Sequence, residues 1–483
     1  MTLTPVPIAN GFYVSDSLPI SHQQCQNFVP VIQQAPSLSV SQLIGSPGIR
    51  QIADSGGGAA DVNRGMHKMG TFPYTVNGTV LYRIDRALVA GVETFSLVSL
   101  GTVEGSGRVS MADNGTQLMI LVPGGKGYIY SVAGGFVEIT DADFRANGDP
   151  QYVVFIDGYF ACSTDSKAWI VSNLNDGTAW DALDFGSAES DPDKIVAPIV
   201  HANQIFLTGS ETTEGFQNIG GSGFPFQRSN IYLDKGCYAP FSLISTNQRF
   251  FMIGGGKDEG PAVWAYQGGT YNKVSTLAID NVMSEYSEAV LNAAFALSWS
   301  KKGQYFAAFS FPDRTFVFNM TTNIWHELTS SIENEEGDFD QERWRVNSLV
   351  SAYNYIIVGD NQDGRIGILD VNEYGEYGNN IIRIFSTQPL INNTKSFRIP
   401  SIELTLEAGI GNGVADPLVS MAISENSKTF DYERSRKIGM IGKYGQRTVW
   451  RKNGRVPRFC VLRFRISDQI KAVVIRLDMD LIP

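Results

Sequence analysis

The chain of 483 residues carries 38 Lys and Arg against 49 Asp and Glu, a formal charge of −11, and 43% of its residues are hydrophobic. That apolar content excludes a largely disordered chain and is enough for about three ordinary domains, or two if one is large. Glycine is frequent, at 49 residues, and aromatic residues reach 11%, a combination that favours turn-rich β structure over helical bundles.

The N-terminus and the cysteines indicate a protein made in a reducing compartment. The first residues lack the basic and apolar regions of a signal peptide, and no apolar run approaches the ~20 residues that span a bilayer. The four cysteines lie far apart without a CxxC pair, a spacing that excludes a zinc site and a disulfide framework. We therefore expect buried free thiols and no membrane insertion by the chain itself.

Residues 1–50 predict an extended N-terminal arm. The segment is rich in Pro, Ser and Gln and ends in the turn-forming run Gly45-Ser-Pro-Gly48. It has little apolar material for a core of its own. We expect it to pack on another part of the molecule, the platform domain predicted at the C-terminal end.

Residues 51–385 predict a β-propeller. They repeat one pattern, in which a short apolar β run, a Gly/Asn/Asp turn and a second apolar run follow one another; examples begin at Leu118, Tyr152, Phe250, Tyr305 and Tyr355. The second run recurs at intervals of roughly 40 to 52 residues, the spacing of propeller blades. We predict six or seven blades. A pair of β-sandwiches has the same strand composition but requires no fixed period.

Two segments depart from this repeat. Residues 283–296 are apolar on one face at helical spacing and predict the one helix of useful length. From residue 386 to residue 483, strand-like runs are separated by Gly-rich or charged turns, which predicts an antiparallel, β-sandwich-like platform domain. The expected fold class is therefore all-β, a propeller with a sandwich platform.

Positive charge is concentrated in residues 434–476. The segment holds thirteen Lys and Arg against one acid, Asp468, a net +12 that leaves −23 on the other 440 residues. Charged and apolar residues alternate over 461–466 as in a half-buried strand, so we expect a folded sheet with one electropositive face. We predict that this face docks another protein through Lys443, Arg447, Arg451, Lys452, Arg455, Arg458, Arg463 and Arg465.

One turn and one aromatic residue define the expected geometry of this face. Asn453-Gly454 is a strong signal for a type I′ hairpin turn, because both central residues of that turn take positive φ. Trp450 lies in the strand that leads to it, and we expect its ring to pack inward or against a neighbouring subunit.

Motifs for chemistry are missing from the sequence. The four histidines are scattered, and HExxH, GxSxG and GxxxxGK[ST] do not occur. The glycine-rich runs are interpreted as hairpin turns. We expect a protein that is not an enzyme and holds no cofactor or metal.

Several strings resemble those of a known family, the tail hub or nozzle proteins of short-tailed (podovirus-type) bacteriophages, also called packaged-DNA stabilisation proteins. The resemblance runs in patches from about residue 46 to residue 477 and is densest after residue 400. Its strongest strings are Gly105-Ser-Gly-Arg-Val-Ser-Met-Ala112 and Gly442-Lys-Tyr444-Gly-Gln-Arg447-Thr-Val-Trp450-Arg-Lys-Asn-Gly454-Arg455. Weaker matches are Ser46-Pro-Gly48 and Asn175-Asp-Gly-Thr-Ala-Trp180-Asp-Ala-Leu-Asp184-Phe185.

The resemblance implies a structural role in a virion tail. A member of this family is expected to form a homo-hexameric collar beneath the portal-bound adaptor ring, assembled in the host cytoplasm. The protein docked by the basic face would then be the adaptor or a neighbouring subunit. It would extend the channel through which the genomic DNA passes, carry tailspikes or tail fibres, and hold the packaged DNA until ejection.

Three alternatives stay open at this point. The basic segment 434–476 can line the channel and grip DNA in place of docking a protein. A carbohydrate-binding or carbohydrate-active propeller would require carboxylates and aromatics clustered on one rim. A cytoplasmic interaction scaffold of the WD-repeat kind explains the period, but neither the basic domain nor the family strings.

Overall fold

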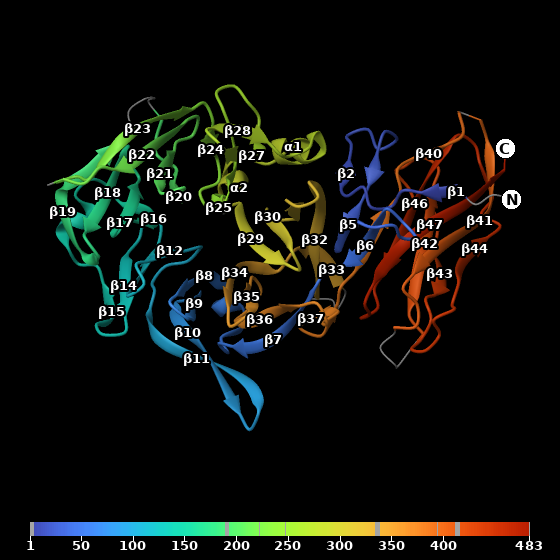
Figure 1. Cartoon of the computed structure of the whole chain (residues 1–483), viewed down its shortest axis with the longest axis horizontal. Helices are drawn as coiled ribbons and strands as arrows, with labels where there is room; N and C mark the ends of the chain where they lie inside the picture. Colours follow the sequence, from blue (N-terminus) through green and yellow to red (C-terminus); the bar gives the residue numbers. More distant parts are fainter. Residues whose placement is uncertain are drawn as a thin grey trace.

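The structure, a computed structural model, describes residues 4–188, 193–221, 223–246, 248–333, 339–393, 395–410 and 416–482. Two β-rich bodies lie side by side (Figure 1), a ring of small sheets and a sandwich that carries both ends of the chain. The described residues confirm the predicted all-β propeller with a sandwich platform, and the propeller has seven blades.

The first six blades follow one another along the chain. Blades one to three consist of β8 (Asn63–Met69), β9 (Phe72–Asn77), β10 (Val80–Val89) and β11 (Val92–Thr102); β12 (Ser110–Asp113), β13 (Gln117–Leu121), β14 (Gly127–Ser131) and β15 (Gly135–Glu138); and β16 (Pro150–Ile156), β17 (Tyr159–Thr164), β18 (Ala168–Asn173) and β19 (Asp176–Ser187). Blades four to six consist of β20 (Ala197–His201), β21 (Gln204–Thr208), β22 (Thr213–Asn218) and β23 (Phe226–Leu233); β24 (Gly236–Cys237), β25 (Ile244–Ser245), β26 (Phe250–Gly255), β27 (Ala262–Gln267) and β28 (Thr270–Lys273); and β29 (Phe295–Lys301), β30 (Gln304–Ser310), β31 (Thr315–Asn319) and β32 (Ile324–Glu333), with β33 (Phe339–Arg343) paired to β32.

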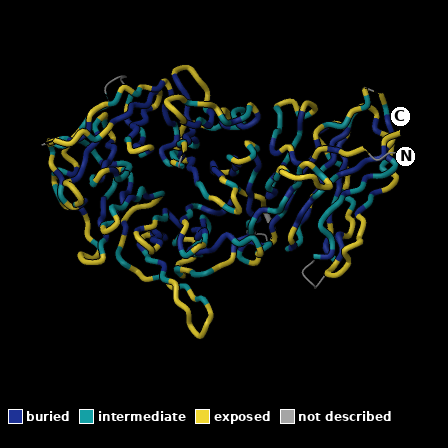
Figure 2. The backbone as a smooth tube through the Cα atoms, in the orientation of Figure 1, coloured by how far each residue is buried: buried dark blue, intermediate teal, exposed yellow. Residues whose placement is uncertain are grey.

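The central strands of the blades are apolar along their whole length because they are buried on both faces. In β13, Leu118 and Ile120 belong to the core shared with blade one, whereas Met119 and Leu121 belong to the core shared with blade three. Successive side chains of a strand point to opposite faces, so each blade packs against two neighbours at once. Figure 2 shows this buried interior around the ring, and the exposed hairpin of β10 and β11 that projects from it.

The seventh blade is completed by the N-terminal segment. Its strands are β34 (Val346–Ala352), β35 (Tyr355–Asp360), β36 (Arg365–Asp370) and β7 (Gly48–Asp54). Strand β7 pairs antiparallel with β36, and β37 (Gly375–Glu376) adds in parallel to the far side of β7 and pairs with β38 (Asn379–Asn380). The ring is therefore closed by hydrogen bonds between segments more than 300 residues apart.

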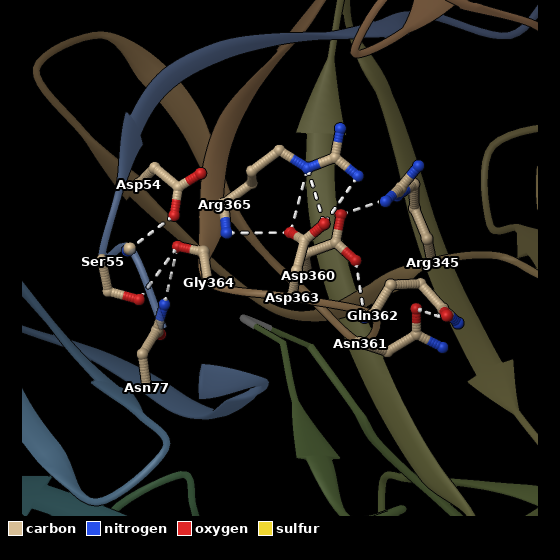
Figure 3. Close-up of polar contacts among 11 residues, drawn as sticks. Asp54, Ser55, Asn77, Arg345, Asp360, Asn361, Gln362, Asp363, Gly364 and Arg365 are labelled. Carbon is tan, nitrogen blue, oxygen red and sulfur yellow. Dashed lines mark hydrogen bonds and ion pairs between the residues drawn. The ribbon is translucent and has the colours of Figure 1, made fainter. Parts of the chain in front are cut away.

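A polar network supports this closure (Figure 3). The Nε of Arg345 donates to Asp360 at 2.6 Å, and both side chains are almost fully buried. Arg365 and Asp363 form a second, less buried pair, and both guanidinium groups lie over the ring of Tyr377. The carbonyl of Gly364 accepts hydrogen bonds from the blade-one side chain of Asn77 and from Ser55. The network thus joins blade seven to blade one.

The platform is a sandwich of two sheets, in each of which strands far apart in the sequence lie next to one another. One contains β44 (Thr448–Arg451), β41 (Phe397–Leu406), β47 (Val473–Ile482), β6 (Ser41–Gly45) and β5 (Phe28–Ile32), with β1 (Thr4–Val6) on β47 and β45 (Arg455–Val456) on β41. The other contains β4 (Cys25–Gln26), β39 (Arg383–Ser386), β46 (Phe459–Ile466), β42 (Leu418–Ser424) and β43 (Arg434–Lys437), with β40 (Leu390–Ile391) on β46. Side chains from both sheets, including Ile402, Trp450 and Phe464, form one core.

The N-terminal segment also ties the platform to the propeller. Strand β4 pairs in parallel with β32 of blade six and antiparallel with β39 of the platform. Asn27 follows it with a positive φ of 55° and donates its side-chain amide to the carbonyls of Thr329 and Ile382. A short pair, β2 (Tyr13–Val14) and β3 (His22–Gln23), precedes β4, and Phe12 packs on Phe316 of blade six. The predicted domain boundaries at residues 50 and 385 stay predictions.

The helix predicted over 283–296 is wrong in extent. The described chain has α1 (Leu277–Ser284), a short α2 (Glu288–Asn292), and strand β29 from Phe295. Two 3₁₀ turns, Gly58–Asp61 and Ala142–Arg145, complete the helical elements. The apolar run that suggested one continuous helix extends into β29, the innermost strand of blade six. In that strand the residues are apolar because they are buried, and not because they form one face of a helix. All four cysteines are free and buried, and burial raises the pKa of each thiol.

Removal of Asp360 should destabilise the propeller far more than removal of Asp363. Asp360→Ala leaves the buried guanidinium of Arg345 without its counter-charge, which typically costs about 3–5 kcal/mol. Asp363 is a quarter exposed, so Asp363→Ala should change the free energy of unfolding by no more than about 1 kcal/mol. Urea denaturation of the two variants measures the difference, and equal losses would show that burial of the Arg345 pair does not support ring closure.

The buried carboxyl of Glu376 should make stability fall as pH rises. Burial raises its pKa to about 7, above its ordinary value of 4.5. Between these two values the folded chain keeps a proton that the unfolded chain has lost, so the free energy of unfolding decreases with pH. Glu376→Gln should remove this decrease, and its stability relative to the parent should rise by up to about 3 kcal/mol between pH 5 and pH 7.5.

Urea denaturation at the two pH values measures the change for Glu376→Gln. Glu373→Gln, three residues earlier and less buried, is the control and should follow the parent. Parallel pH profiles for the parent and Glu376→Gln would contradict the raised pKa.

Candidate docking surface

The eight predicted docking residues lie on both sheets of the platform. Six of them, from Lys443 to Arg458, belong to the β44 and β45 edge of the first sheet and to the turns around it, whereas Arg463 and Arg465 lie on β46 of the second sheet. On each sheet the apolar neighbours, such as Trp450 and Phe464, enter the shared core, so the charged side chains point outward from opposite faces. The expectation of a single electropositive face is therefore wrong.

Acidic residues from neighbouring strands and loops pair with part of the basic segment. Arg447 makes two hydrogen bonds to Glu403 of β41, at 2.8 and 2.6 Å. Arg465 pairs with Glu433 at 2.8 Å, and the guanidinium of Arg463 lies 4.1 Å from the ring centroid of Phe430. Lys443 lies 3.9 Å from Asp416. These pairs reduce the local excess of charge that the sequence suggests.

The cations that stay available gather on the edge of the first sheet. The side chains of Arg451, Lys452 and Arg458 are exposed and make no ion pair within the described ranges. Arg455 donates only to the hydroxyl of Ser396, at 2.6 Å. We call these four residues, together with Arg398, the cationic edge.

Arg398 is a member that the sequence analysis missed. It lies on β41, 36 residues before the basic segment, and its register partner is Arg455. Like charges directly opposite one another in a sheet are unfavourable unless an anion lies between them. Arg398, Lys452 and Arg455 line a surface hollow of about 360 Å³ with no acid in its lining. The sequence did contain a signal for Arg398: it lies between the apolar residues Phe397 and Ile399, an alternation that predicts a strand with Arg398 on its exposed face.

The predicted type I′ hairpin at Asn453-Gly454 is also wrong. Strands β44 and β45 do not pair with each other; both pair with β41, at Ser401↔Arg451 and Arg398↔Arg455. Positive φ occurs at Lys452 (58°) and Gly454 (90°), not at Asn453. The segment 452–454 is a β-bulge within one edge strand, with one extra residue relative to β41. The bulge directs Lys452 and Arg455 toward solvent beside Arg398.

Trp450 anchors this edge from inside. Its side chain is fully buried, its indole N–H donates to the carbonyl of Arg434 at 2.7 Å, and its ring lies 5.6 Å from that of Phe464. The inward packing expected for Trp450 is confirmed.

The described residues offer neither a metal site nor a membrane-spanning helix. In that part of the chain no group of three or more His, Cys, Asp and Glu side chains is arranged to hold a metal ion. None of its helices has the length and apolar character to cross a membrane.

Comparison with known proteins identifies the family. The family model described as "Bacteriophage P22 Gp10, beta-propeller" matches residues 4–374, and the model described as "Bacteriophage P22 Gp10, beta-sandwich" matches residues 382–481. The chain belongs to the bacteriophage P22 Gp10 family.

The chain is also similar to one curated protein and to solved structures of known name. The "Tail hub protein gp10" of Salmonella phage P22 is 22% identical over 442 residues, which cover 87% of each chain. Among solved structures, the N-terminal domain of Nup159 is similar with a TM-score of 0.42 and 10% identity, over 72% of this chain and 99% of that one. The WD40 β-propeller domain of Doa1 has a TM-score of 0.39 and 12% identity, over 67% and 96%.

In this Gp10-family chain, Trp450→Ala should destabilise the platform by about 3–5 kcal/mol, because the side chain is large and fully buried. The adjacent Val449 points outward and is only partly buried, so Val449→Ala is the matched control and should cost much less. Thermal unfolding of both variants checks the difference. Native-like melting of Trp450→Ala would mean that the ring does not hold the two sheets together.

Proposed function

We propose that the chain is a structural tail hub, or nozzle, protein of a short-tailed bacteriophage, and that it has no enzymatic activity. The observation that carries this proposal is the joint match of both domains: one family covers the propeller and the sandwich, in the same order. The full-length relative is named a tail hub protein, and its match covers 87% of both chains. The protein would accordingly belong to the virion tail, after assembly in the host cytoplasm.

Six copies would form a collar beneath the portal-bound adaptor ring. In a ring each subunit uses two different surfaces, one for each neighbour, so a protein with distinct bodies suits this arrangement. The collar would extend the channel for the genomic DNA, retain the packaged DNA until ejection, and carry tailspikes or tail fibres.

The cationic edge is the proposed docking surface for the adaptor or for a neighbouring subunit. Three of its five cations, Arg398, Lys452 and Arg455, line a hollow without acids, while the rest of the chain outside the basic segment has a charge of −23. An acidic partner would compensate the repulsion between Arg398 and Arg455. Exposed charges act mainly on encounter rate and salt sensitivity, so single replacements should be tolerated. A surface that grips DNA is the alternative, and such a surface would slow ejection.

Reversal of three charges on the cationic edge should block assembly. Arg451, Arg455 and Arg458 are replaced together by Glu, and the purified chain is mixed with an adaptor complex and imaged by negative-stain microscopy. The parent should form six-fold collars on the adaptor, and the triple variant should not.

The matched control is the replacement of Lys68, Lys257 and Lys302 by Glu. All three are exposed on the propeller, and the total change of charge is the same. Collars with the control but not with the edge variant would support docking through the edge. Collars with both variants would contradict that surface while leaving the hub function in place, and a parent that ignores the adaptor would overturn the hub function itself.

A further inference from the structure

The axis of the propeller contains a cavity with one charged side chain. Its volume is about 300 Å³, and innermost strands of the blades line it, from β8 in blade one to β34 in blade seven. Most of the residues that line it are apolar in type, with Met66, Tyr152, Phe241 and Leu297 among them, although polar atoms form about half of the lining surface. Arg108 is the only charged residue among the described residues that line it.

Arg108 belongs to the sequence motif Gly105–Ala112, which lies in the propeller and is not part of the proposed docking surface. Gly105 and Gly107 take positive φ, 84° and 79°, and so form the bend that leads into β12. Arg64 holds this bend in place, because its guanidinium donates to the carbonyls of Gly78, Val103, Glu104 and Gly107. The string therefore places Arg108 at the axis on a rigid support.

The two arginines differ in how their N–H groups are satisfied. Arg64 has four carbonyl acceptors, whereas the buried Nε and Nη1 of Arg108 have no hydrogen-bond partner in the described parts of the chain. The guanidinium of Arg108 lies over the ring of Phe295, 3.8 Å from its centroid, and 5.4 Å from that of Phe241. Aromatic faces attract the cation but accept its N–H groups only weakly.

Among the residues that the structure describes, no acid forms an ion pair with Arg108 either. The nearby ionised group is a second cation, Arg343, whose guanidinium lies 5.3 Å from the same Phe295 ring. Arg343 already donates to the carbonyl of Trp344 and to the side chain of Asn347. Burial, and then repulsion from Arg343, lower the pKa of Arg108 to about 9, so the guanidinium stays charged at neutral pH. A buried charge is costly unless it is paired.

We propose that the axial cavity binds a small inorganic oxyanion, with phosphate as the representative ligand, and that Arg108 is its primary ligand. The guanidinium supplies charge and N–H donors, which match an oxyanion well. The nearby Arg343 adds positive potential. A cavity of about 300 Å³ accommodates an ion of this size, whereas it lies at the lower limit for an organic ligand. This inference rests on the propeller alone and is independent of the tail hub proposal.

The test compares the full chain with Arg108→Met, which keeps side-chain length but removes the charge. Thermal unfolding is followed while potassium phosphate replaces potassium chloride at constant ionic strength. The midpoint of the parent should rise with phosphate and follow a single-site dependence. Without phosphate, Arg108→Met should be at least as stable as the parent, since it removes a half-buried charge whose Nε and Nη1 donors are buried without a partner in the described chain. With phosphate, the order should reverse.

Two controls test whether the effect of phosphate comes from the axial cavity. Lys257→Gln removes an exposed positive charge on the propeller, away from the cationic edge, and should respond to phosphate like the parent. A single-stranded oligonucleotide in place of phosphate should give no shift that depends on Arg108, because a strand does not fit the cavity.

Several results would overturn the proposal. A parent whose midpoint does not change as phosphate replaces chloride shows no preference for an oxyanion. Equal responses of the parent and Arg108→Met place any phosphate effect elsewhere. A loss of stability in Arg108→Met that is the same with and without phosphate means that the protein itself satisfies the guanidinium. A larger Arg108-dependent shift with the oligonucleotide assigns the site to nucleic-acid phosphates.

Discussion

The pairing of the N-terminal segment with both bodies is the constraint on which the rest of the structure depends. Strand β7 is the outer strand of blade seven, and β4, β5 and β6 complete the two sheets of the platform. Asn27 adds side-chain hydrogen bonds to blade six and to the residue that precedes β39. Neither the ring nor the sandwich is complete without these residues, so the two bodies form one mechanical unit. A continuous run of hydrogen-bonded strands from β29 to β43 crosses between them.

Electrostatic compensation differs between the interior and the platform surface. Inside the propeller, Arg345 has Asp360 and Arg64 has backbone carbonyls, so their burial is supported. In the described parts of the chain, the buried Nε and Nη1 of the half-buried Arg108 have neither, which sets Arg108 apart from Arg345 and Arg64. On the platform, acids from neighbouring strands pair with part of the basic segment, and the bulge at 452–454 leaves the remaining cations exposed beside Arg398. A rigid edge with unpaired charge is well suited to recognition, because little side-chain or backbone order has to be gained on binding.

These features fit the proposed role of a structural protein that holds its partners in fixed positions. A closed ring of blades has few exposed strand edges, and its stability comes from apolar faces shared by neighbouring blades. Such a body can hold partners at fixed distances. The two proposed binding surfaces lie where the regular pattern is interrupted, at the bulge of the platform edge and at the axis of the ring.

The sequence by itself determined the fold class and the repeat, because apolar runs at blade spacing require sheets buried on both faces; it also indicated the basic character of 434–476 and the burial of Trp450. Only the tertiary structure decided which strands pair. The register of β44 and β45 on β41 converted the expected Asn453-Gly454 hairpin into a bulge, divided the basic residues between two sheets, and brought Arg398 next to Arg455. The closure of the ring by β7 and the position of Arg108 at the axis were likewise decided only by the tertiary structure. Local propensity is a property of neighbouring residues, whereas register and face are set by hydrogen bonds between segments far apart in the chain.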